Sequence, residues 1–187
     1  MQITLSWDLL VIIFFATVIA YSFIVGRDAS VKIIIATYIA VVTVQGTGNL
    51  IAKMAGDSGS PLSIVGLDLD PGWLGLTKIL LFVAVILFLA LRGGFDMHYV
   101  KDIPGIWDTL LTGVFGFATA GLILSTLLTF VAGRPILDVG LADAAPLIPL
   151  LAGSTLMQTM VHYQDLWFTF PALLLLGMGF FSTDMSE

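Results

Sequence analysis

The sequence predicts an all-α integral membrane protein with about four transmembrane helices and a C-terminal helical hairpin that is amphipathic or re-entrant. Hydrophobic residues make up 58% of the 187 residues and charged residues only 11%, whereas soluble domains carry about 25% charged residues. The apolar residues fall into long runs, and a helix of ~20 residues crosses the ~30 Å core of a bilayer. We therefore expect residues 1–187 to form a single multi-pass domain in contact with the lipid bilayer.

Four apolar stretches are long enough to span, at about residues 7–25, 31–51, 73–91 and 106–131. A Trp opens three of them and a fourth Trp opens the last apolar segment, at Trp7, Trp73, Trp107 and Trp167. Indole rings prefer the headgroup level, so these residues mark where membrane begins. A short polar turn at residues 26–30 is expected to reverse the chain after the first span.

Charge excludes several classes of function. Seven Lys and Arg stand against thirteen acidic residues, which gives a net charge of −6. No basic cluster is present, so nucleic-acid binding and a polybasic lipid anchor are not expected. The chain has no Cys and no HExxH sequence, and no acidic or basic residue lies in the middle of a span. We expect no cofactor, no metal, no catalytic residue and no enzymatic activity.

The few basic residues also suggest an orientation. Lys78 lies near the start of the third span, where its long stem allows the ammonium group to reach the interface. The positive-inside rule places the N-terminus outside, because four basic residues follow the first and third spans (Arg27, Lys32, Arg92 and Lys101) and three lie at the opposite ends (Lys53, Lys78 and Arg134).

The second half of the second span is unusually polar. Thr43, Gln45, Thr47 and Asn49 lie there, and Gln45 and Asn49 share one helix face because they are four residues apart. An unpaired amide in hydrocarbon costs several kcal/mol. These side chains are therefore expected either to bond a neighbouring helix or to line a polar path.

Small residues recur every fourth position along the fourth span. In lipid, helices associate over such residues because the backbones approach closely, and hydroxyl groups add hydrogen bonds. One row holds Thr112, Gly116 and Ala120, and a second holds Gly121, Ser125 and Thr129. The predicted helix-packing residues are Thr112, Gly113, Gly116, Ala120, Gly121 and Ser125.

Two less regular segments follow. Residues 146–163 have an amphipathic pattern suited to the membrane interface. Residues 166–181 are strongly apolar but only 16 residues long, with Pro171 inside. A fifth, thin span, a re-entrant segment and a helix along the surface all fit this pattern, and we favour a hairpin of the two segments that is embedded without crossing. His162 and Asp165 would make an incomplete metal site.

Residues 108–116 carry a recognisable motif, with an acidic residue, then Leu-Leu, then Gly-apolar-apolar-Gly: Asp108-Thr109-Leu110-Leu111-Thr112-Gly113-Val114-Phe115-Gly116. This motif resembles the corresponding helix of the colicin V production protein family of small bacterial inner-membrane proteins, and the order of four spans is similar. The sequence departs from that family in lacking a basic residue between the acid and the glycine pair and in having a less basic first turn. The resemblance implies a role in envelope maintenance or export, without catalytic residues.

The leading hypothesis is a non-enzymatic integral membrane subunit or scaffold. It would assemble through its small-residue helix faces with copies of itself or with other membrane proteins, in the bacterial inner membrane if the resemblance holds. The alternative is a small channel or transporter with a polar path formed by Thr43, Gln45, Thr47 and Asn49.

Overall fold

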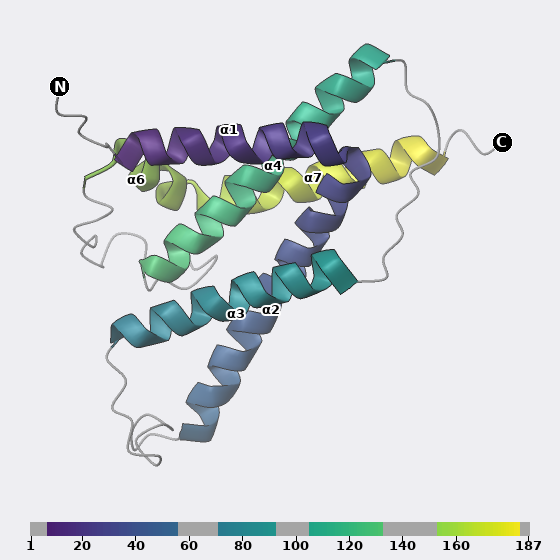
Figure 1. The fold of residues 1–187 in the computed structure, drawn as a ribbon. Helices are drawn as coiled ribbons and strands as arrows, with labels where there is room; N and C mark the ends of the chain where they lie inside the picture. The colour runs from purple at the N-terminus through teal and green to yellow at the C-terminus, as the bar shows by residue number, and fades with distance from the viewer. Residues whose placement is uncertain (1–6, 56–70, 93–104, 133–152, 184–187) are drawn as a thin grey trace. The chain divides into compact units, whose positions relative to one another are not determined.

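The computed structural model describes residues 7–55, 71–92, 105–132 and 153–183, and the regular structure in these ranges is entirely α-helical (Figure 1). The all-α prediction is confirmed for this part of the chain. Lys101, Arg134 and residues 146–152 of the 146–163 segment lie outside the described residues. The helices are α1 Trp7–Val25, α2 Arg27–Ala55, α3 Pro71–Arg92, α4 Gly105–Val131, α6 Thr155–His162 and α7 Gln164–Thr183.

Three stretches of helix in the described ranges are long and apolar enough to cross a membrane, namely Trp7–Val25, Arg27–Leu50 and Ile106–Val131. They coincide with the first, second and fourth expected spans, so the protein has the candidate spans of a multi-pass membrane protein. Helix α3 contains the third expected span, residues 73–91.

The connection between α1 and α2 is shorter than the sequence suggested. Only Gly26 separates the two helices, and residues 27–30 already belong to α2. Gly26 has a φ of +88°, a left-handed conformation that glycine adopts without steric cost. Its N–H donates to the carbonyl of Ser22 at 2.9 Å, and the hydroxyl of Ser30 donates to the Gly26 carbonyl at 3.2 Å. Gly26 alone therefore connects α1 and α2, where the sequence predicted a turn of five residues.

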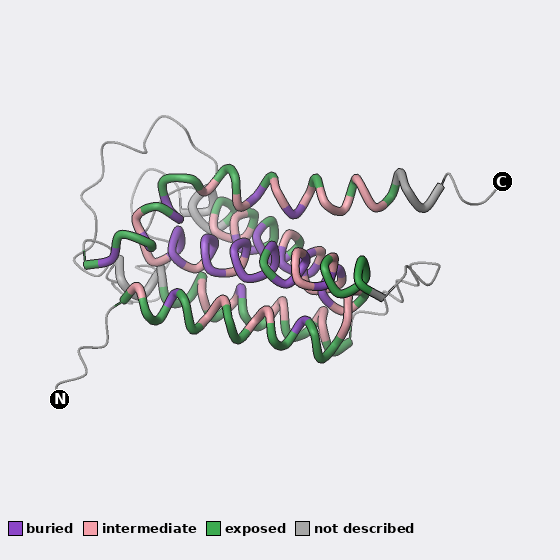
Figure 2. The backbone as a smooth tube through the Cα atoms, turned by 90° about the horizontal axis from the view of Figure 1, so that it is seen from above, coloured by how far each residue is buried: buried purple, intermediate pink, exposed green. Residues whose placement is uncertain are grey.

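The helices fall into two compact units. Unit 1 comprises residues 1–34 and 94–187, and unit 2 comprises residues 35–93. In unit 1, α4 lies between α1 and α7 and also contacts α6. It is the most buried of the three candidate spans, with 72% of its apolar stretch enclosed (Figure 2).

Helix α4 runs antiparallel to both of its long neighbours. Gly116, in the first half of α4, lies beside Ser22 near the end of α1, while Thr129, near the end of α4, bonds Gln164 at the start of α7. The start of α1, the end of α4 and the start of α7 therefore lie at one end of unit 1. The end of α1 and the start of α4 lie at the other.

The amphipathic pattern of the 146–163 segment appears in α6, but its apolar face is covered by protein. Met157, Met160 and Val161 are buried in a cluster with residues of α1 and α4. These neighbours are Val11, Leu124 and Leu128. The apolar face of α6 therefore packs on α1 and α4. The amphipathic pattern alone does not distinguish such a protein contact from a contact with lipid. Helix α7 continues through Pro171, whose side chain is fully buried.

Candidate functional site

The face of α4 toward α1 is built from small residues in direct contact with that helix. A Cβ added at Gly116 would lie 2.8 Å from the Cβ of Ser22 and 3.2 Å from the Cα of Ile19. A Cβ added at Gly113 would lie 3.2 Å from the ring of Phe23. The two glycines therefore permit the close approach of α1, as expected of helices packed without a hydrophobic driving force.

The second small-residue row of α4 receives a side chain from α7. The indole of Trp167 lies over Gly121 so closely that an added Cβ would fall 2.0 Å from the ring. Phe15 and Phe117 hold this indole, with ring centroids 5.8 and 5.5 Å from it. Trp167 therefore fills a notch that only glycine leaves open. Trp167 lies 46 residues after Gly121. The sequence therefore predicted Gly121 as a packing residue but did not predict that Trp167 packs on it.

The buried threonines of α4 satisfy their own hydroxyl groups. Thr112, Thr119, Thr126 and Thr129 each donate a hydrogen bond of 2.7–2.8 Å to the carbonyl four residues earlier. Such bonds allow a hydroxyl to be buried among apolar groups without a partner on another helix. Thr129 also donates to the side-chain oxygen of Gln164 at 3.3 Å.

All six predicted helix-packing residues are either buried in unit 1 or in contact with another helix of unit 1. Thr112, Ala120 and Ser125 are buried, and Gly113, Gly116 and Gly121 meet Phe23, Ser22 and Trp167. The Ser125 hydroxyl has no hydrogen-bond partner among the described residues. The small-residue faces of α4 are thus occupied by the chain's own helices.

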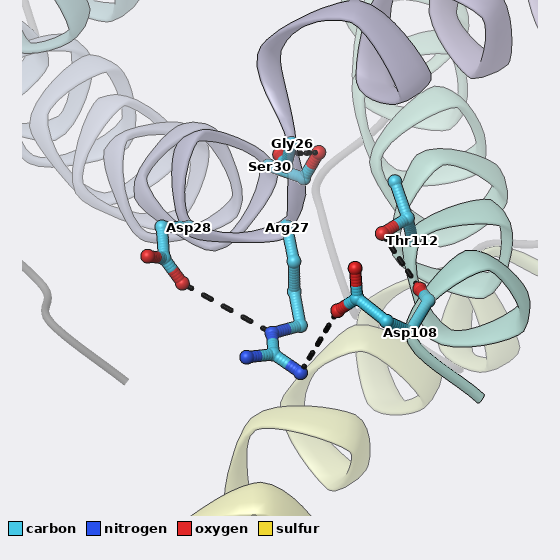
Figure 3. Close-up of polar contacts among 6 residues, drawn as sticks. All are labelled: Gly26, Arg27, Asp28, Ser30, Asp108 and Thr112. Atoms are coloured by element: carbon cyan, nitrogen blue, oxygen red, sulfur yellow. Dashed lines mark hydrogen bonds and ion pairs between the residues drawn. The ribbon is translucent and has the colours of Figure 1, made fainter. Parts of the chain in front are cut away.

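A charged cluster stands at the end of unit 1 where α1 ends and α4 begins. The guanidinium of Arg27 reaches Asp108 in the first turn of α4, with 3.4 Å between Nη1 and Oδ1, and lies 4.0 Å from Asp28 through Nε (Figure 3). The Arg27 side chain is only 11% exposed, whereas both carboxylates are about half exposed. This ion pair joins the α1–α2 turn to α4. Sequence reasoning identified Asp108 by its motif but assigned it no partner.

A polar cluster at the opposite end of unit 1 fixes α6. Ser154 is the N-cap of α6 and accepts from the Met157 N–H at 3.1 Å. The Ser154 hydroxyl donates to Asp8 of α1, and the Leu156 N–H donates to the same carboxylate oxygen at 3.2 Å. Asp8 therefore supplies a second acceptor for the unpaired N–H groups at the helix start. A serine before an apolar run indicates a helix N-cap, so the capping role of Ser154 is predictable from sequence. Its hydrogen bond to Asp8 is not predictable in this way.

The predicted polar path lies in unit 2, on α2. The hydroxyl of Thr43 donates to the carbonyl of Ile39 at 2.8 Å, so this residue is satisfied within its own helix. Gln45 and Thr47 are half-buried and Asn49 is exposed. Lys78 of α3 lies alongside, with its Cε 3.8 Å from the position of a Cβ at Gly48. The sequence placed Lys78 at the interface and did not predict its contact with α2.

No group of three or more His, Cys, Asp or Glu side chains gathers in the ranges that the structure describes. His162 and Tyr163 are exposed, and their rings pack edge to face with centroids 4.8 Å apart. Comparison with known proteins finds no family model, no curated protein and no solved structure that matches this chain.

Proposed function

We propose that this chain is a non-enzymatic multi-pass membrane subunit or scaffold whose structural centre is α4. The observation that carries the proposal is the environment of α4: 72% of its apolar stretch is buried, and the chain has no acidic or basic residue between Thr109 and Val131. Ionisable groups that face a bundle interior mark ion pathways and proton relays in membrane proteins. The centre of unit 1 instead holds packed glycines, self-bonded threonines and aromatic rings.

The ion pair at the start of α4 supports a count of four spans. Arg27 and Asp108 meet at one end of unit 1, which supports an even number of membrane crossings in the chain between them. That stretch contains α2, a candidate span, and α3, so an even number supports α3 as a further span. The exposed Trp7 and Trp107 open helices that start at opposite ends, as expected of indoles at two interfaces.

The side of each end follows from the basic residues. Arg27 and Lys32 lie near the end of unit 1 that holds Asp108, and the positive-inside rule places this end in the cytoplasm. The start of α1 is then outside. Helix α7 begins at the same end as α1 and packs along α4, which supports a C-terminal segment that is embedded in the membrane.

The motif of residues 108–116 coincides with the contact between α1 and α4. Asp108 pairs with Arg27, and Gly113 and Gly116 face α1. The likeness of this motif to the colicin V production protein family implies a role in envelope maintenance or export in the bacterial inner membrane, which is part of this proposal. Because the glycine faces are occupied within the chain, assembly with partners uses the exposed face of α1.

Site-specific photo-crosslinking in the native membrane tests this role. A photoreactive amino acid at Ile13 or Ile24, which are 52% and 84% exposed on α1, is expected to give protein adducts of defined mass. The same group at Ala120, which is 0% exposed, serves as the matched control and gives none. Lipid adducts alone at both α1 positions, together with a monomeric mass after gentle extraction, would contradict the scaffold role.

A further inference from the structure

Unit 2 carries three polar residues on α2 and α3 that have no side-chain partner among the described residues. Lys78 on α3 and Gln45 and Asn49 on α2 have no side-chain hydrogen bond or ion pair among the described residues. The described residues of unit 2 contain no Asp or Glu at all. An ionisable residue within a membrane-spanning segment ordinarily pairs with a group of the protein or marks a ligand site. Within the described part of unit 2, no acid is present to pair with Lys78.

Helix geometry brings the two amides to the place where Lys78 contacts α2. Residues 45, 48 and 49 share one face of a helix, because residues three and four apart are neighbours. Gly48 has no side chain, and the Cε of Lys78 lies 3.8 Å from where its Cβ would be. The lysine stem therefore contacts α2 at this glycine, on the helix face to which the periodicity assigns Gln45 and Asn49.

The donors at this place define the chemistry of a ligand. The ammonium group offers three N–H donors and no acceptor, and each amide offers two N–H donors. A phosphate group has several strong acceptor oxygens and a negative charge, and a lysine binds it as a point charge. Lys78 and Asn49 are exposed, so the place is open from outside the unit. We infer that Lys78, Gln45 and Asn49 form a binding site for a phosphate group.

Two sources can supply such a group, an anionic phospholipid headgroup or free inorganic phosphate. Lys78 is seven residues after the start of α3, or ~10 Å along the helix, and its stem can bring the ammonium group toward the headgroup level. The inference does not depend on the scaffold role, because it concerns unit 2 alone.

Binding to the delipidated full-length chain in a neutral detergent tests the inference. Native mass spectrometry with short-chain phosphatidylglycerol forms one arm, diacylglycerol with the same chains is its phosphate-free control, and ³¹P line broadening of inorganic phosphate forms the other. Binding in the lipid arm alone identifies a headgroup site, and binding of inorganic phosphate identifies a site for a free anion. In either arm, the binding affinity is expected to fall about tenfold or more in Lys78→Met, because a charge-assisted hydrogen bond is lost.

Matched variants separate a site from general charge. Lys32→Met removes a charge from α2 outside unit 2 and is expected to leave binding unchanged. Gly48→Ala is expected to be tolerated at 3.8 Å, whereas Gly48→Leu displaces the lysine stem and weakens binding. Absence of binding in both arms, or equal losses in Lys78→Met and Lys32→Met in well-folded protein, would overturn the inference.

Discussion

The contact at Gly116 gives the sharpest test of how unit 1 is held together. In Gly116→Ala the new Cβ meets the Cβ of Ser22 at 2.8 Å and the backbone of Ile19 at 3.2 Å. The backbone atom cannot rotate away, so α1 must shift. Overpacking of this kind costs about 1–3 kcal/mol, and the gain in helix propensity from Gly to Ala offsets up to about 1 kcal/mol. We expect a net loss of about 1–2 kcal/mol in the free energy of unfolding.

The matched control is Gly177→Ala in α7, where nothing lies within 4 Å of the new Cβ. This variant receives the propensity gain without the clash and is expected to be neutral or slightly more stable. Unfolding by increasing sodium dodecyl sulfate, followed by Trp fluorescence, measures both variants in the same mixed micelles.

A double-mutant cycle identifies the clashing atoms. Ser22→Gly removes the two nearest atoms that the new Cβ would meet, so it is expected to recover about 1 kcal/mol of coupling free energy with Gly116→Ala. Equal stability of Gly116→Ala and Gly177→Ala, or a coupling free energy of zero, would refute the packing of α1 on α4 at this glycine.

Three further perturbations probe other contacts of unit 1. Trp167→Ala empties the notch at Gly121 and is expected to cost about 3 kcal/mol by the same unfolding assay; a loss below about 0.5 kcal/mol would count against the notch. Asp8→Ala removes an acceptor at the start of α6 and is expected to speed amide hydrogen exchange in that helix, with a cost of about 1 kcal/mol; unchanged exchange there would contradict this capping role. Arg27→Met breaks the partly exposed pair with Asp108, so a loss of only about 0.5–1 kcal/mol is expected, decreasing as salt is added; a loss independent of salt would point to packing of the arginine stem.

The long helices were largely predictable, because each contains an apolar run whose length and composition predict a membrane helix. Helix α4 begins one residue before the expected span 106–131 and ends with it. The predicted turn at 26–30 is longer than the connection in the structure, because the sequence does not show that Gly26 takes a left-handed conformation. Local patterns predict what a segment forms better than where it starts.

The candidate sites were predictable in part. The rows of small residues on α4 predicted close packing because helices in lipid associate where small residues let their backbones approach. Their partners, Ser22 and Trp167, lie far away in the sequence, and no local pattern links them to Gly116 and Gly121. The same limit applies to Lys78, which the sequence placed near the interface by its position while its contact with α2 depends on how two helices meet.

The most direct test of the central claim is the accessibility of single cysteines in sealed membrane vesicles, which the absence of native Cys makes possible. Asp28→Cys reports the end with the ion pair, and Tyr163→Cys, which replaces a 55% exposed side chain, reports the end with α6. Ala16→Cys lies midway along α1 and is expected to resist a charged maleimide. We predict that the Asp28 and Tyr163 positions react from opposite sides of the membrane. Reaction of both from the same side would contradict a bundle that crosses the bilayer around α4.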